Sequence, residues 1–417
     1  MNLSMPDTVN AGRRTRQADR ETDGFFEEYC GEQQLVVIGN GFDRACGLKS
    51  SYEDFFKDRL RAVASIWCYE RPEWERVVKE KGLTAWDFIL KVSGKGTDWC
   101  NVEKAMGDWV LPVKDKPHVP EIIEELFTML DNWPFGKPHV KFDRNGVSEL
   151  SERELALRGV CGYVWYGMGH QPGREMNRSL LLAFLRCELG KLEKLFNDYL
   201  AHEQSKDDHY RGRAVALLND ITRDGALSSC EEIYDKGRTT VLSFNYTTPF
   251  CFSNSVVDES NVVNIHGRLN SEIVFGVDGK ECMWDLDALP FTKTYRVASM
   301  NVDIGKRLYG TAALDDCESE TGAIKFFGHS LGEADYSYFQ SIFDAVNLYS
   351  GNTRLVFYYR PWTGKKEEEL HTEMVVAVTR LLTTYGATLD NKDHGKNLMH
   401  KLLLEGRLEI KKLQERA

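Results

Sequence analysis

The stretch Leu35–Asp43, LVVIGNGFD, decides the fold of this chain. Its four leading apolar residues, three of them β-branched, predict a short strand that is buried on both faces. Gly39 and Gly41 end the strand at once, and a helix is expected soon afterwards, because Ser50 and Glu53 stand in capping-box register. A strand, a glycine turn and a helix together present backbone N–H groups that suit a phosphate.

The Gly-x-Gly turn has two interpretations, a phosphate-binding turn or an ordinary turn that binds nothing. The dinucleotide fingerprint requires a third glycine three residues beyond the second, and this position is Arg44. The sequence therefore argues against an ordinary dehydrogenase fold.

The composition predicts a globular protein of two or three domains. The chain has 417 residues, and 42% of them are hydrophobic, which is enough to bury a sizeable core. The formal net charge is −11, and this disfavours broad nucleic-acid binding, because contact with phosphates relies on a basic surface. A local basic groove stays open as an alternative.

Cysteine spacing bears on metal binding, and the lengths of the apolar runs bear on membrane contact and cellular location. None of the ten cysteines forms a Cys-x-x-Cys pair, so no metal is expected. No signal peptide and no apolar run near the 20 or so residues that span a bilayer is present, so we expect a cytoplasmic protein without membrane contact. Residues 1–24 are polar and are expected to form a mobile tail.

The middle of the chain, residues 67–238, has helical periodicity and is predicted to be a helical insertion. Its clearest helix is expected over Arg178–Leu200, where an apolar stripe indicates core packing. Prolines punctuate the region around Leu111–Gly173, so loops and short helices, in the arrangement of a lid, are expected there.

Strand signals return after the insertion. They cover Thr239–Asn245, Asn261–His266, Ile273–Val277, Ile324–Gly328 and Arg354–Arg360. Strands that alternate with helices predict an α/β fold with a doubly wound, mostly parallel sheet. We assign residues 25–66 and 239–390 to this nucleotide-binding domain, and residues 391–417 to a C-terminal helical segment that follows a helix over Glu367–Tyr385.

Polar residues recur where successive strands end. They are Asn40, Asp43, Asn245, Thr247, His266, His329 and Asp335. In open parallel sheets the ligand sits beyond the carboxyl ends of the strands, so these residues are expected at one edge.

The combination of these segments resembles the AbiH family of phage abortive-infection proteins. The resemblance rests on residues 38–43, 47–52, 244–247, 265–267, 275–278 and 327–332, and on the Trp-centred acidic motif at residues 98–103. AbiH proteins in turn look like distant sirtuin-type folds, which have a Gly-x-Gly turn, an Asn-bearing strand end and a His-Gly pair in that order. Gly39–Gly41, Asn245 and His266–Gly267 stand in this order.

The resemblance implies a sirtuin-like Rossmann variant that binds NAD as its substrate, with the nicotinamide–ribose bond near Asn245 and His266 as catalytic residues. Residues implied in NAD binding are Gly39, Asn40, Gly41, Phe42, Asp43, Thr247, Gly328, His329 and Ser330; Glu103 and Asp335 are further candidates. The zinc module of protein-deacylating sirtuins is absent, because no Cys-x-x-Cys pair exists. NAD hydrolysis is therefore favoured over peptide deacylation.

Cleavage of an N-glycosidic bond passes through an oxocarbenium-like state, so a site must orient the ribose and activate a water. Asn245 can orient a water or a ribose hydroxyl, and His266 can accept a proton near neutral pH. Each residue also has a structural interpretation: His266 as a hydrogen-bonded strand end, His329 as a turn anchor, Asp43 as a brace of the turn, and Glu103 as a solvated charge. Lys293 is expected to be structural.

Three functions were compared on these grounds. The sequence favours an NAD-cleaving hydrolase that acts as an antiphage effector, and the alternative is a nucleotide-binding sensor in a defence system without turnover. A metal-assisted nuclease is disfavoured by the acidic charge and by the lack of closely spaced metal ligands. A phage-derived trigger or a companion defence protein is the expected partner, and homo-oligomerisation is left open.

Overall fold

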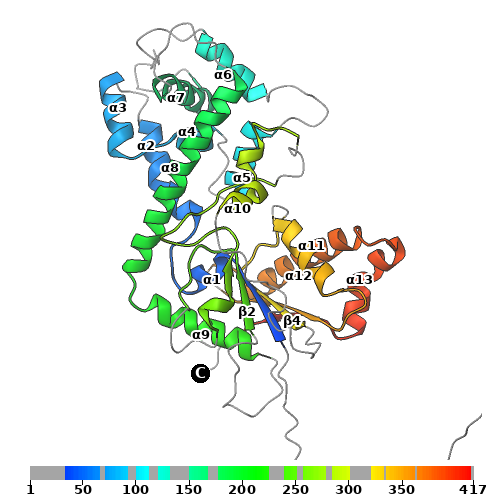
Figure 1. Ribbon diagram of the computed structural model, residues 1–417. Helices are drawn as coiled ribbons and strands as arrows, with labels where there is room; N and C mark the ends of the chain where they lie inside the picture. The colour runs from blue at the N-terminus through cyan, green and yellow to red at the C-terminus, as the bar shows by residue number, and fades with distance from the viewer. Residues whose placement is uncertain are drawn as a thin grey trace, which may run out of the picture. The chain divides into compact units, whose positions relative to one another are not determined.

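Six parallel strands form one sheet in the order β3-β2-β1-β4-β5-β6 (Figure 1). The strands are β1 Gln33–Ile38, β2 Thr239–Ser243, β3 Val262–Asn264, β4 Thr321–Phe327, β5 Arg354–Tyr359 and β6 Leu408–Lys412. The chain runs outward on both sides of β1, which is the strand order of a Rossmann doubly wound sheet. The structure thus confirms the predicted α/β fold and the central place of the Leu35–Asp43 stretch.

The structure is a computed structural model. It describes residues 33–65, 71–92, 100–111, 121–131, 150–167, 177–224, 239–250, 257–278, 284–300, 321–332, 335–361 and 364–414. The expected N-terminal tail, residues 1–24, lies outside these ranges. Among the described helices, none is long and apolar enough to cross a membrane.

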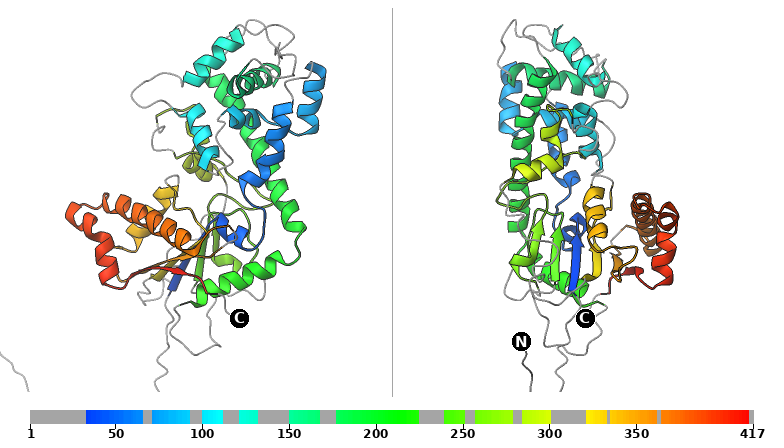
Figure 2. Two further views of the ribbon diagram at one scale, coloured as in Figure 1. Left: turned by 180° about the vertical axis from the view of Figure 1, so that it is seen from behind. Right: turned by 45° about the vertical axis from the view of Figure 1, so that its right-hand side comes forward.

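Side chains of β1 alternate between two cores, one on each face of the sheet. Leu35 and Val37 pack with α11 (Tyr336–Ala345), α12 (Glu367–Gly386) and α13 (Lys392–Leu404). Val36 and Ile38 pack with α1 (Asn40–Ala45) and α9 (Tyr210–Arg223). Figure 2 shows α13 and α9 on opposite sides of the strands. A strand buried on both faces needs apolar residues at every position, as this stretch has.

Helix α9 packs on the sheet, although the sequence placed it within the helical insertion. The buried ammonium of Lys325 on β4 donates to the carbonyl oxygens of Ile221, Thr222 and Asp224 at 3.0, 2.9 and 2.8 Å. These acceptors belong to the last turn of α9 and the residue that follows it, where carbonyls lack intrahelical partners. One lysine therefore fixes the end of α9 against the sheet.

Most of the remaining helices share a separate core. They are α2 Tyr52–Ser65, α3 Arg71–Glu80, α4 Ala85–Val92, α5 Cys100–Val110, α6 Glu121–Asp131, α7 Glu152–Gly167, α8 Arg178–Ser205 and the short η4 Leu289–Phe291. Among the described residues, α10 Lys293–Ser299 and the short η3 Glu259–Asn261 contribute no side chain to this core. Trp86 and Trp109 are fully buried, and the apolar stripe of α8 packs among them as predicted. Residues 112–120, 132–149 and 168–176 lie outside the described ranges, so the lid stays a prediction.

Three local expectations were wrong. Helix α2 is capped by Ser51 and Asp54 and not by Ser50 and Glu53, since the Asp54 N–H donates to the Ser51 hydroxyl at 3.1 Å. Residues 273–277 form only isolated bridges, from Ile273 to Gly267 and from Val277 to Thr292, and no strand. The C-terminal segment, expected to be helical, also contains the edge strand β6, which pairs with β5.

Candidate functional site

Polar side chains occupy equivalent positions beyond four neighbouring strands. The register pairs Ile38 with both Ser243 and Phe327, and it pairs Ser243 with Asn264. Two residues beyond these positions stand Asn40, Asn245, His266 and His329. Because all the strands are parallel, this register brings the four residues to one edge of the sheet, as the sequence predicted.

The glycine turn lies against the turn that follows β4. Gly41 N–H donates to the Gly328 carbonyl at 2.8 Å, and Gly39 N–H donates to the Phe327 carbonyl at 3.1 Å. A Cβ on Gly41 would lie 2.6 Å from the Cα of Gly328, a contact that only glycine avoids. The two amides expected to hold a pyrophosphate are thus used within the protein, and the glycines serve this close approach.

A buried lysine lies between two carboxylates at the same edge. Lys293 Nζ is 2.7 Å from Glu103 Oε1 and 2.8 Å from Asp335 Oδ1, and the residue is only 5% exposed. Glu103 lies on α5, Lys293 begins α10, and Asp335 immediately precedes α11. This ion pair therefore joins the helical core to the sheet.

Electrostatics keep this cluster charged. Burial alone would raise the pKa of Asp335, but its interaction with His329 and the charge of Lys293 outweigh burial and hold this pKa well below its usual range. Burial would lower the pKa of Lys293, and the two carboxylates raise it above its usual value. Burial raises the pKa of Glu103, with Lys293 opposing. Asp335 is thus the strongest permanent negative charge at this edge.

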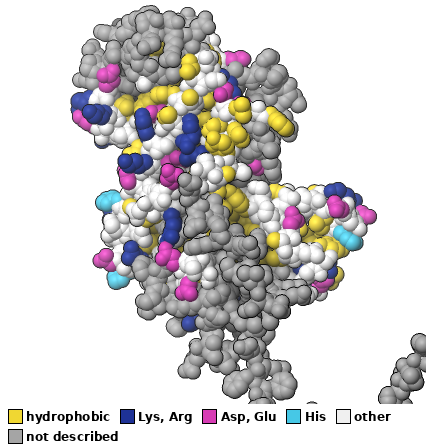
Figure 3. All heavy atoms as spheres, in the orientation of Figure 1, with side chains coloured by type: hydrophobic (Ala, Val, Ile, Leu, Met, Phe, Trp, Pro, Cys, Tyr) yellow, Lys and Arg dark blue, Asp and Glu magenta, His cyan; other side chains and the backbone are white. Residues whose placement is uncertain are grey.

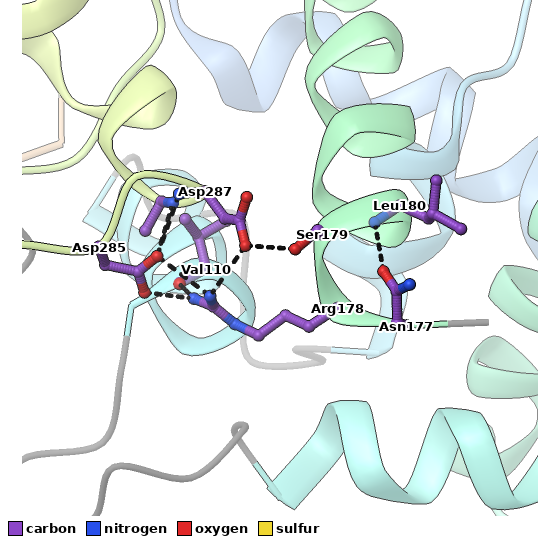
Figure 4. A network of polar contacts seen from close by, with 8 residues as sticks. Val110, Asn177, Arg178, Ser179, Leu180, Asp285 and Asp287 are labelled. Atoms are coloured by element: carbon purple, nitrogen blue, oxygen red, sulfur yellow. Dashed lines mark hydrogen bonds and ion pairs between the residues drawn. The ribbon is translucent and has the colours of Figure 1, made fainter. Parts of the chain in front are cut away.

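A second network fixes the helices that carry these charges (Figure 4). Arg178, at the start of α8, makes a bidentate pair with Asp285 at 3.1 and 2.7 Å and also donates to the Val110 carbonyl at the end of α5. Asp285 accepts the Ala288 N–H in the turn that leads to α10. Arg178 thereby holds α5 and the α10 turn together, which positions Glu103 against Lys293.

His329 has a fixed tautomer. The Leu331 N–H donates to its Nδ1 at 2.9 Å, so the ring proton resides on Nε2, which lies 3.4 Å from Asp335 Oδ2. Leu331 has a φ of +55°, and Gly328 has a φ of +70°, so the turn holds left-handed backbone on both sides of His329. The turn-anchor role and the contact with Asp335 therefore occur together.

His266 is buried beside this cluster. Its Nε2 lies 3.6 Å from Asp335 Oδ1, beyond hydrogen-bond distance, and within the described ranges this atom has no hydrogen-bond partner. Phe244 and Tyr338 surround the ring, with centroids 5.5 and 5.9 Å away. Burial, with the nearby charge of Lys293, lowers the pKa of His266 to about 3. The imidazole is neutral at physiological pH, whereas the sequence predicted a base that titrates near neutrality.

Asn245 presents a second unsatisfied polar atom. Its Nδ2 is buried and makes no hydrogen bond of standard geometry in the part of the chain that the structure describes, although the Asn245 side chain lies close enough to the Asp43 carboxylate to lower the pKa of that group. The Asn264 amide donates to the carbonyls of Asn245 and Thr247 at 2.7 and 3.1 Å, which fixes the backbone of this loop. Orphaned buried donors of this kind are uncommon and destabilise a fold by about 1–3 kcal/mol.

Other predicted binding residues have structural partners. The carboxylate of Asp43 accepts the hydroxyls of Tyr210 and Thr247, each at 2.8 Å at its shortest. Phe42 is fully buried and packs edge-on against Phe250 and Phe327, so its side chain belongs to the core beneath the sheet edge. The side chain of Asn40 accepts the Ser50 hydroxyl, while Ser330 is exposed.

The sequence assigned Lys293 a structural role, and it did not predict the pairing of this lysine with Glu103 and Asp335. Its partners are 190 and 42 residues away in the chain, so no local spacing connects them. The motif around Glu103 was noticed, but its Asp98 and Trp99 lie outside the described residues. A lysine and two distant acids become a site only when the fold brings them together.

The grouping of possible metal ligands and the side chains on the surrounding surface bear on which ligands the site can bind. In the described part of the chain, no group of three or more His, Cys, Asp and Glu residues is arranged to hold a metal ion. On the face drawn in Figure 3, basic and acidic side chains are interspersed, and hydrophobic side chains gather over α5 and α10. Trp284 and Leu286, just before α10, are 97% and 80% exposed.

Comparison with known families gives one match. Residues 191–359 match the family model described as Bacteriophage abortive infection AbiH. The matched segment contains Asn245, His266, Lys293, His329 and Asp335, and over these residues it confirms the resemblance to the AbiH family. Comparisons with curated proteins and with solved structures gave no match.

Proposed function

We propose that this chain, which shares residues 191–359 with the AbiH family, acts in abortive infection by phage and does so by hydrolysing NAD at its nicotinamide–ribose bond. The family match supports the defence role. We infer the hydrolysis from the chemistry of the residues at the sheet edge.

Two buried polar atoms without partners carry this proposal. Asn245 Nδ2 and His266 Nε2 make no hydrogen bond of standard geometry among the described residues, and they belong to residues at equivalent positions after adjacent strands. A ligand that offers hydrogen-bonding oxygens there would satisfy both atoms and remove their desolvation penalty. Ribose hydroxyls and the carboxamide of nicotinamide have this chemistry.

The charge at the site suits the transition state of this reaction. Asp335 stays ionised, His266 stays neutral, and Lys293 is already paired with two carboxylates. A ribosyl cation that develops beside Asp335 would therefore face an ionised carboxylate, in a buried site where electrostatic stabilisation is strongest.

The low pKa of His266 changes its proposed role. A general base works best when its pKa lies near the working pH, and a value of about 3 gives little driving force to remove a proton from water. We therefore assign His266 and Asn245 to orienting the ribose and the attacking water. Asp335 supplies the charge stabilisation.

The same low pKa favours a second candidate, a sensor that binds NAD without cleaving it. The sensor would use the same site, because Asn245 Nδ2 and His266 Nε2 can contact NAD whether or not it is cleaved. Release of nicotinamide separates the two functions.

The experiment incubates the purified full chain with NAD and follows free nicotinamide by chromatography. Asn245→Ala and His266→Ala should each reduce release at least about a hundredfold, the usual size of a lost transition-state contact. His394→Ala, at an exposed histidine of α13, is the matched control and should retain the rate. Binding without release in the wild type would establish the sensor, and neither binding nor release would refute both.

A further inference from the structure

The carboxylate of Asp43 is buried without a cation. The residue is 1% exposed, and within the described ranges it makes no ion pair. Its oxygens accept one hydroxyl from Tyr210, at the start of α9, and one from Thr247, in the loop after β2. A buried carboxylate is held in such a place only by strong, charge-assisted hydrogen bonds.

These two hydrogen bonds join the exit of β1 to the exit of β2. Asp43 follows the glycine turn on α1, and Thr247 lies two residues after Asn245. The loop is held elsewhere too, because the Asn264 amide donates to its backbone carbonyls and the Tyr246 hydroxyl donates to a backbone carbonyl outside the loop at 3.1 Å. The Thr247 hydroxyl is the contact through which Asp43 holds the segment that presents Asn245.

We propose that Asp43 is a positioning residue for the site: its ionised carboxylate holds the Asn245 loop in place through Thr247, and its neutralisation releases that loop. The inference deepens the proposed NAD hydrolysis and rests on it for the catalytic consequence, while the effect on the loop stands on the contacts alone.

The surroundings of Asp43 set the direction of its pH response. Burial raises its pKa to about 6, and the hydrogen bonds from Thr247 and Tyr210 oppose this, together with the side chain of Asn245. Two titratable neighbours stay protonated: burial and the charge of Asp43 raise the pKa of the Cys46 thiol, at the end of α1, to about 12, and they also raise the pKa of Tyr210. Arg213 on α9 and Arg360 after β5 act on Cys46.

The sign of the catalytic effect follows. The ionised form of Asp43 predominates above pH 6. Below that pH the carboxylate takes up a proton, and its hydrogen bonds to Thr247 and Tyr210 lose their charge assistance and become weaker. Turnover should therefore be about tenfold lower at pH 5 than at pH 7, with the fall centred near pH 6. His266 contributes nothing in this window, because its pKa lies near 3.

The test compares the wild type with Asp43→Asn, which has the shape of the protonated acid. Hydrogen–deuterium exchange of residues 242–250, corrected for intrinsic rates, should accelerate in the wild type as pH falls through 6. In Asp43→Asn it should be fast at every pH, and nicotinamide release should be low and flat with pH. Asp344→Asn is the matched control, because Asp344 also accepts a tyrosine hydroxyl, from Tyr385 at 2.9 Å, but on the opposite face of the sheet.

A second pair of variants keeps the test decisive if Asp43→Asn does not fold. Thr247→Val removes the anchoring hydroxyl and should accelerate exchange of the same peptide, whereas Thr247→Ser retains the hydroxyl and should restore protection. Unchanged protection in Asp43→Asn or Thr247→Val would overturn the positioning role, whatever the activity. A loosened loop in a protein that never releases nicotinamide would retain that role and refute the hydrolysis.

Discussion

Replacement of Lys293 by methionine tests the buried charge cluster most directly. The change keeps the length of the side chain but removes the ammonium that lies 2.7 Å from Glu103 and 2.8 Å from Asp335. Two carboxylates, 22% and 15% exposed, then face each other without a cation. Removal of one partner from a buried ion pair destabilises a fold by about 3–5 kcal/mol, because the remaining charge is left uncompensated.

The magnitude can be read as a change in melting temperature. Unfolding entropy near 60 °C is about 2.1 cal/mol/K per residue, so a chain of 417 residues gives about 0.9 kcal/mol per degree. Lys293→Met should therefore lower Tm by about 3–6 °C at pH 8 in differential scanning calorimetry. The loss should shrink at pH 5, since one of the like-charged carboxyl groups can then take up a proton.

Lys396→Met is the control. Lys396 pairs with Asp393 at 3.4 Å on the surface of α13, with side chains 75% and 86% exposed. An exposed pair of this kind is screened by solvent, so Tm should stay within about 1 °C. Equal melting temperatures for Lys293→Met and the wild type at pH 8 would refute the view that Lys293 neutralises the cluster.

Two further outcomes follow from the same structure. Gly41→Ala should lower Tm by several degrees, because its Cβ would lie 2.6 Å from the Gly328 Cα. The control is Gly212→Ala on α9, whose Cβ would meet nothing within 4 Å; it should leave Tm unchanged or raised, since alanine favours a helix. A similar change in Tm for the two variants would contradict the close approach of Gly41 to Gly328. His266 has a folded pKa of about 3 against about 6.5 unfolded, so between these values the unfolded chain binds more protons and stability is lost as pH falls. His266→Gln should therefore lose less Tm than the wild type between pH 7.5 and pH 5, and parallel losses would show that His266 does not titrate in this way.

The sequence alone determined the sheet and the polar edge at the carboxyl ends of its strands. Period and composition are local properties: the apolar run of β1 requires burial on both faces, and Gly39 and Gly41 require a turn directly after it. Parallel strands place their carboxyl ends at one edge, so Asn245, His266 and His329 could be assigned to a common site before any coordinates.

Two predictions from local sequence patterns were wrong, and the structure gives the reason for each. The edge strand β6 was read as part of a helical segment, because an edge strand half open to solvent carries no continuous apolar run. The capping box of α2 was misplaced by one residue, since Ser50 and Ser51 are adjacent candidates and the Ser50 hydroxyl is taken by Asn40.

Only the tertiary structure decided the chemistry of the site. Lys293, Glu103 and Asp335 come from α10, α5 and the turn before α11, and their mutual distances depend on how the helical core packs against the sheet. Burial and these neighbours set whether a group is charged: they keep Asp335 ionised, keep His266 neutral and bring Asp43 close to neutral titration. Protonation depends on desolvation and on charges distant in sequence, and neither quantity is encoded in any local stretch of the chain.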